Sequence, residues 1–368
     1  MHNSRRAARH RSEHKRPLCV PGARLDDYYD SQTETRESDL AERWTRFGTD
    51  AAHGRRAVRL DRVSAEMEIP RLYTDALTDY TRGVDDSLDN RTLRLAVREL
   101  RSQRTDGIVF APIGHWDVSR VTNFEFLFRE WPEFNEPIGE WDVSRATTMR
   151  GMFCNCRDFN QAIGNWDVSN VRDFASMFNG ASSFNQPIGE WTVSRATCMR
   201  GMFRLCDAFD QPIGNWDVSN VRDMGRMFQS ASAFNRPLLG WQVGRVVSFQ
   251  SMFESCRALN VAFDWNAPSV VITDDMFKTA TAMNRAVTII TPALRSAVGM
   301  FAGATAMRQT VRLDMSSVTA ASEMFVGCPD EAKVDTKSTE SAIVRRQLGS
   351  RLLATRGATR SATRKRAP

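Results

Sequence analysis

A repeat of 24–25 residues is the feature that most limits the folds open to this chain. Tryptophans recur every 25 residues from Trp116 to Trp241, and phenylalanines recur every 25 residues from Phe128 to Phe253 and every 24 residues on to Phe325. Columns that run in step are typical of stacked structural units. We predict nine units over residues 107–328, with two aromatic ladders inside. The ladder residues are Trp116, Trp141, Trp166, Trp191, Trp216 and Trp241, with Phe128, Phe153, Phe178, Phe203, Phe228 and Phe253.

Each unit contains a segment with the spacing of a short strand. Trp166 and Val168 are two residues apart, so in a strand their side chains point to the same face. We expect that face to be buried, with Asn165 and Asp167 on the solvated side. One unit cannot bury its apolar face alone, but stacked units can, each strand pairing with the next.

The segment after the strand has the spacing of a helix. Val171, Phe174 and Phe178 are three and four residues apart, so they could share one face of a short helical segment. We therefore predict an α/β repeat solenoid of the leucine-rich-repeat kind, with about nine units and short parallel strands. An all-β solenoid is the alternative.

The polar residues on the solvated side of the predicted strands form a candidate binding face. Solenoids use such extended faces to bind partners, although ordinary surface residues would show the same pattern. The aspartates in this row either accept hydrogen bonds from the backbone of the following turn or form a calcium ladder. Calcium loops alternate acids with glycine, so the first interpretation is favoured. The candidate residues are His115, Asp117, Glu140, Asp142, Asn165, Asp167, Glu190, Asn215 and Asp217.

Residue types that carry catalysis or hold cofactors are scarce in the repeats. Of five histidines only His115 lies within residues 107–328, and the chain has no phosphate-binding or dinucleotide-binding glycine motif. Cys154 and Cys156 form a lone C-x-C pair, too few ligands for zinc. Cys206 and Cys256 share a column with Cys156 and with alanines, which predicts small buried thiols. We expect a protein that is not an enzyme and that has no cofactor or metal.

The positive charge of the chain is concentrated at its two ends. Residues 1–24 contain seven basic groups and one acid, and residues 329–368 contain ten and four. Residues 107–328 contain 19 basic and 21 acidic groups, so their composition does not indicate nucleic-acid binding. The alternative function is therefore binding of nucleic acid or an anionic surface through the basic N- and C-terminal tails.

The regions outside the repeats divide into three. Residues 1–59 are polar and basic, and we expect them to be largely disordered. Residues 60–106 should form a helical N-terminal cap, because Leu93, Val97 and Leu100 have helical spacing and Asp89 or Asn90 can begin the helix. Residues 329–368 should form a basic C-terminal tail, helical over 341–352 and then disordered.

The stretch IGNWDVSNVRDMGRMFQSASAFNRP, residues 213–237, resembles the 25-residue repeat of the BspA-type leucine-rich-repeat surface proteins, also called the Mycoplasma-lipoprotein repeat. The resemblance covers residues 107–328. It implies a solenoid that binds other molecules, commonly at a cell surface, and it brings no catalytic residues.

The expected function is a non-catalytic interaction scaffold. It would bind an unidentified protein, or a surface glycan, through the extended solenoid face. No signal peptide, lipid anchor or transmembrane segment is recognised, so an intracellular location is expected; the cell surface is the alternative that the resemblance implies. The sequence does not predict the oligomeric state.

Overall fold

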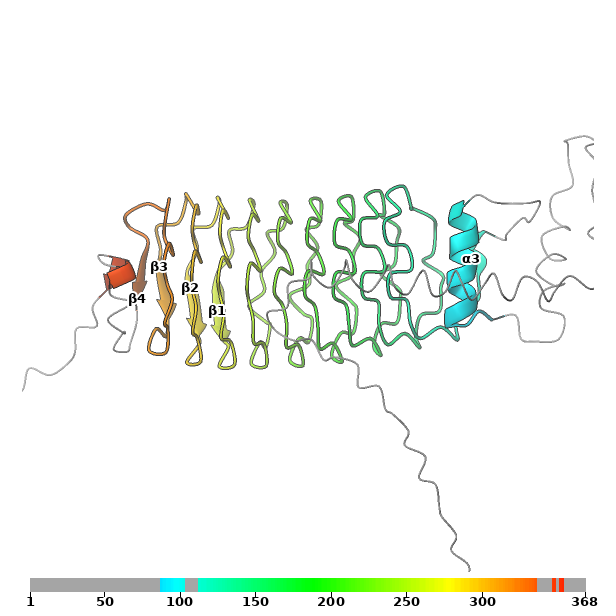
Figure 1. Cartoon of the computed structure of the whole chain (residues 1–368), viewed down its shortest axis with the longest axis horizontal. Coiled ribbons are helices and arrows are strands. Elements are labelled where there is room, and N and C mark those ends of the chain that lie inside the picture. Colours follow the sequence, from blue (N-terminus) through cyan, green and yellow to red (C-terminus); the bar gives the residue numbers. More distant parts are fainter. Residues whose placement is uncertain (1–86, 103–111, 336–345, 349–350, 354–368) are drawn as a thin grey trace, which may run out of the picture. The chain divides into compact units, whose positions relative to one another are not determined.

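A computed structural model describes residues 87–102, 112–335, 346–348 and 351–353, all of which belong to one compact unit, Glu68–Pro368. The predicted region 1–59 lies outside the described residues. Helix α3 (Asn90–Ser102) comes first, and the short 3-10 helix η1 (Ile113–His115) follows it. The strands are β1 (Phe263–Asn266), β2 (Val287–Ile290), β3 (Thr310–Leu313), β4 (Lys333–Asp335) and β5 (Leu352–Leu353). Between α3 and β4 the repeat units, which we call coils, lie side by side in chain order (Figure 1).

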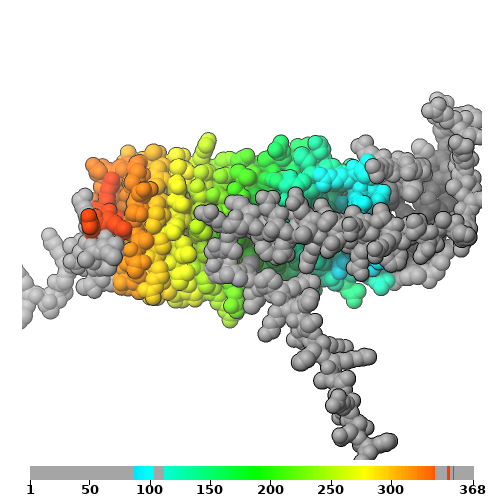
Figure 2. Space-filling view, viewed as in Figure 1, coloured from blue at the N-terminus to red at the C-terminus, as the bar shows by residue number. Residues whose placement is uncertain are grey.

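Successive coils pair in parallel. The five strands form one parallel sheet in chain order, β1 to β5. A second ladder of isolated parallel bridges joins residues one repeat apart, from Asn123 and Thr148 to Ser296 and Ala320. The coils form successive bands of colour in Figure 2, as expected when each unit packs against its neighbours. The predicted repeat fold with parallel pairing is confirmed.

The segment around the tryptophan forms a strand only in the shorter coils. In β1 a single residue separates the buried Phe263 from the buried Trp265, so the side chains alternate as in any strand. In a 25-residue coil two residues separate Ile163 from Trp166, and the chain turns there, with the Trp166 N–H donating to the Ile163 carbonyl at 3.2 Å. In both kinds of coil the indole Nε1 donates to the preceding coil: that of Trp166 to the Ile138 carbonyl and that of Trp265 to the Leu238 carbonyl, each at 3.1 Å. The additional residue therefore converts a predicted strand into a turn.

The prediction of a helical segment after the strand is wrong. Within residues 112–335 the structure has turns there and no α-helix. The N–H groups of Phe174, Ser176 and Phe178 donate to carbonyls of the next coil at 2.8–3.0 Å. The intervening Met177 N–H donates to the carbonyl of Phe174 at 3.1 Å. An α-helix would use all these donors within itself, whereas here alternate donors join neighbouring coils.

Residues in the left-handed region of backbone space produce this alternation. Ser176 has φ 55° and Gly180 has φ 76°, and the same two positions have positive φ in the other coils. Most of these residues are not glycine, although L side chains disfavour this region. The hydrogen bonds between coils compensate for that cost at every repeat.

The aromatic columns form the interior. All twelve predicted ladder residues are buried. Phe178 stacks on Phe153 at 5.6 Å and on Phe203 at 5.7 Å between ring centroids, and within its own coil on Phe184 at 3.9 Å. Trp191 and Trp216 stack at 6.4 Å. Offset-stacked rings with this much buried area dominate the packing energy of a core.

Helix α3 closes the first coil. As predicted, Asp89 begins it: the Asp89 carboxylate accepts from the N–H groups of Arg91 and Thr92. Leu93 and Val97 are buried against the stack. The first coil has no preceding coil to donate to its carbonyls, and two arginines of α3 take that role. Arg94 donates to the Glu125 carbonyl at 2.7 Å, and Arg101 donates to the carbonyls of residues 129 and 130.

The last coil is closed in a similar way. Arg351 donates to the carbonyls of Cys328, Pro329 and Ala332. The Gln347 side chain accepts the Ala321 N–H at 2.8 Å, a donor that in earlier coils would reach the next coil. Residues 346–348 of the predicted C-terminal helix are helical, and residues 341–345 and 349–350 lie outside the described residues. At its expected end the structure has strand β5, because pairing with β4 satisfies the edge of the sheet.

Phe178→Ala should destabilise the protein by roughly 3–5 kcal/mol, through lost burial and the cavity left between two stacked rings. Phe325→Ala should cost less, because Phe325 stacks on Phe301 from one side only and is slightly exposed. Chemical denaturation of both variants measures the difference. Equal small losses at the two positions would mean that the phenylalanine column is not the core.

Arg94→Met should destabilise the protein by about 1–3 kcal/mol, because the Glu125 carbonyl loses its donor beneath the helix. The matched control is Arg98→Met, since Arg98 is exposed on the same helix. Thermal unfolding compares the two variants. A loss at Arg98 as large as that at Arg94 would contradict a capping role for Arg94.

Candidate functional site

The predicted binding residues lie in one exposed row. All nine candidates, from His115 to Asp217, are exposed, whereas the Trp and Val that flank each aspartate are buried. His115 ends η1 at the start of the row. Glu140 and Glu190 alternate with Asn165 and Asn215 in successive coils, and the row contains no lysine or arginine. We call this row the acidic face.

The aspartates of the acidic face hold the following turns. Asp117, Asp142, Asp167 and Asp217 each accept the N–H of the serine two residues later, at 3.0 Å in every case. Hydrogen bonds from the side chain and the backbone N–H of Ser144 hold the pKa of Asp142 below its usual range. This is the role expected from the sequence. No group of His, Cys, Asp or Glu in the described residues could hold a metal ion.

The small-residue column contains buried thiols. The Cys156 Sγ donates to the Phe128 carbonyl at 3.0 Å, and Cys206 and Cys256 make the equivalent bonds at 2.8 Å. Burial raises the pKa of Cys156 to about 12, so this thiol is protonated at neutral pH. A thiol in that state is a poor nucleophile and a poor metal ligand.

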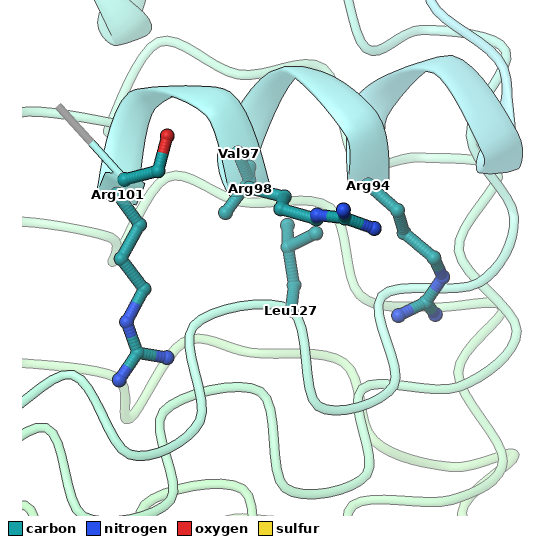
Figure 3. A pocket seen from close by; sticks show the side chains of 6 residues that line it. Arg94, Val97, Arg98, Arg101 and Leu127 are labelled. Carbon is teal, nitrogen blue, oxygen red and sulfur yellow. The ribbon is translucent and has the colours of Figure 1, made fainter. Parts of the chain in front are cut away.

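A shallow depression of about 510 Å³ lies beside α3 and is lined by Arg94, Val97, Arg98, Arg101, Ser102 and Leu127. Figure 3 shows Arg94 and Arg101 extending from the helix towards the loops of the first coil. Both guanidinium groups are bonded to carbonyls there. The Arg101 guanidinium also lies 5.9 Å from the Trp131 ring centre. The arginines that line this depression therefore belong to the cap. Trp131 is partly covered by the cap, through Arg101.

Sequence reasoning missed two arginine–aspartate pairs on the neighbouring side of the stack. Arg150 lies 3.4 Å from Asp173, and Arg200 lies 3.6 Å from Asp223. The second pair is buried, and a side chain at Gly225 would meet the Arg200 guanidinium at 2.6 Å. Desolvation raises the pKa of Asp223, and the Arg200 charge opposes the rise. The sequence feature that could have indicated these pairs is the recurrence of WDVSRATTMRGMF as WTVSRATCMRGMF 50 residues later.

Arg200→Met should destabilise the protein by about 3–5 kcal/mol, because it leaves the buried Asp223 carboxylate without its counter-charge. Arg150→Met is the matched control. Its pair with Asp173 is partly exposed and should contribute about 1 kcal/mol or less. Denaturant unfolding of both variants tests this difference, and similar losses would contradict it.

None of the helices in the described part of the chain is both long and apolar enough to cross a lipid bilayer. The basic tails lie almost wholly outside the described residues, so binding through them stays a prediction.

Comparison with known proteins finds one family. Residues 100–209, 187–290 and 263–338 each match the family model described as "Mycoplasma protein of unknown function, DUF285". Together these segments run without a gap from residue 100 to residue 338, more than half of the 368-residue chain. No curated protein matches the chain.

Proposed function

The chain belongs to this Mycoplasma family of unknown function, and from that premise we propose that it is a non-catalytic scaffold that binds a protein partner along its acidic face. In this proposal residues 107–328 form a solenoid of nine units, as in the BspA-type surface repeats. The exposed row of acidic and amide side chains, repeated in register along the coils, is the observation that supports the proposal.

The acidic face suits a protein partner because its aspartates are held in place. The tryptophan and valine beside each aspartate are buried, and the aspartate bonds to its own turn, so little side-chain freedom is lost on binding. Its carboxylates favour a partner with a basic surface, and electrostatic complementarity of this kind raises the rate of association. The buried, protonated thiols and the single histidine of the repeats support a role without catalysis.

Reversing charge on the acidic face should remove the partner. The test variant is Glu140→Lys/Glu190→Lys in the full chain. The control is Glu133→Lys/Asp158→Lys, which changes net charge equally at exposed positions elsewhere on the coils. We expect pull-downs from the source lysate, quantified by mass spectrometry, to recover partners with the wild type and the control that the test variant loses by tenfold or more.

One further treatment separates the alternatives. Nuclease removes nucleic acid that binds through the basic tails, and the tails are unchanged in all three proteins. If the test variant and the control recover the same partners in the same amounts, the acidic face is not the binding surface.

A further inference from the structure

A row of exposed arginines follows the corner of the stack where each coil leaves the acidic face. Each of five successive coils, beginning with the second, contributes one arginine at either of two positions two residues apart; Arg120 and Arg295 occupy the same positions in coils outside this run. All five are exposed, and no acidic residue occupies either position in any described coil. We call this row the arginine ridge; its members are Arg145, Arg172, Arg195, Arg222 and Arg245.

Backbone hydrogen bonds keep the arginine ridge in register. The Arg172 N–H donates to the Thr147 carbonyl at 3.0 Å, and the Thr197 N–H donates to the Arg172 carbonyl at 2.8 Å. The Arg222 N–H continues the series to Thr197 at 2.9 Å. Paired strands lie about 4.8 Å apart, so the ridge presents a guanidinium at about that interval along the stack.

Asparagines hold alternate members of the ridge in place. Arg195 donates to the Asn170 side-chain oxygen at 2.6 Å, and the Asn170 amide nitrogen donates to the Ser144 carbonyl of the preceding coil at 2.8 Å. Asn220 makes the same two bonds, at 2.6 Å with Arg245 and at 2.8 Å with a serine carbonyl. A neutral partner fixes each guanidinium without neutralising its charge, and its remaining N–H groups stay available.

The acids nearest the ridge in sequence are already paired. Asp173 and Asp223 directly follow two ridge arginines, but their carboxylates pair with Arg150 and Arg200. Within the described residues the five ridge arginines lie in no ion pair. The ridge therefore retains its charge, although the repeats as a whole carry similar numbers of acids and bases.

We propose that the arginine ridge binds an acidic polysaccharide along the axis of the stack, with sugar carboxylates or sulfates on the guanidinium groups. The planar guanidinium matches both groups through paired hydrogen bonds. A sugar ring in a chain advances by about as much as one coil, so acidic groups on successive sugars can meet successive arginines. The ridge adjoins the acidic face, and the Arg145 charge contributes to lowering the pKa of Asp142 there. The two surfaces share no residue, so each proposal is tested with its own variants.

The surroundings of the ridge favour a polysaccharide over a nucleic acid. Base stacking on aromatic side chains is the usual source of affinity for single strands. None of the ridge segments 144–148, 169–173, 194–198, 219–223 and 244–248 contains an aromatic residue. They contain serine, threonine and asparagine side chains, which can hydrogen-bond sugar hydroxyls.

The experiment compares two triple variants of the full chain. Arg145→Gln/Arg195→Gln/Arg245→Gln changes the ridge, and Arg157→Gln/Arg257→Gln/Arg285→Gln removes the same charge from exposed positions elsewhere. The probe is a fluorescently labelled heparin dodecasaccharide, followed by anisotropy over a range of salt. We expect the ridge variant to bind about tenfold or more weakly, with a salt slope shallower by about two, and the control to change less than threefold. Equal affinities of the two variants would overturn the proposal.

Two additional arms keep the outcome interpretable. Oligothymidylate of equal charge replaces the saccharide; if it binds the wild type more tightly and loses more affinity in the ridge variant, the ridge is a nucleic-acid site and the proposal is wrong. Arg172→Gln/Arg222→Gln provides a second ridge variant should the triple variant unfold, and we expect a loss of about fivefold with it. Circular dichroism verifies the fold of each variant.

Discussion

Hydrogen bonds from alternate backbone N–H groups of one coil to the carbonyls of the next are the interaction on which the structure depends. They join Phe174, Ser176 and Phe178 to the following coil, and they recur in each repeat. They require residues with positive φ, which turn the donors along the stack. They also explain why both ends of the stack are capped, because a coil that lacks a neighbour on one side has carbonyls or N–H groups without a partner there. Arg94, Arg101 and Gln347 supply those missing partners.

The same bonds fix which side chains stand in line. Inside the stack, aligned positions give the aromatic ladders, with the rings of Phe153, Phe178 and Phe203 stacked at nearly equal distances. Outside, they give an acidic face and an arginine ridge on two sides of one corner. Acids and bases thus recur in neighbouring rows, although the repeats carry 19 bases and 21 acids. Net charge alone does not reveal these rows.

The sequence predicts the interior well because side-chain spacing records burial directly. Trp166 and Val168 are buried, and Asn165 and Asp167 are exposed, as their spacing requires. The backbone after Val171 is predicted less well. Helical spacing and the observed turns bury the same side chains, and nothing about a residue such as Ser176 marks it as left-handed.

Contacts between coils are the other part of the structure that the sequence of a single repeat does not predict. The place of Arg200 above Gly225 depends on which residues lie side by side in adjacent coils. The arginine ridge is hidden for the same reason. Its members alternate between two positions in the repeat, so no single column contains them all.

The caps bear on how such a chain can change its length. Arg94, Arg101 and Arg351 bond to backbone carbonyls, which every coil possesses, so they do not specify how many coils lie between them. The two-coil block that begins WDVSRATTMRGMF is followed by a near copy. Gain or loss of such a block would leave both ends intact and would add or remove two ridge arginines and their share of the acidic face. Coil number therefore sets the valency of both surfaces, and a tandem duplication can raise avidity without a new contact having to evolve.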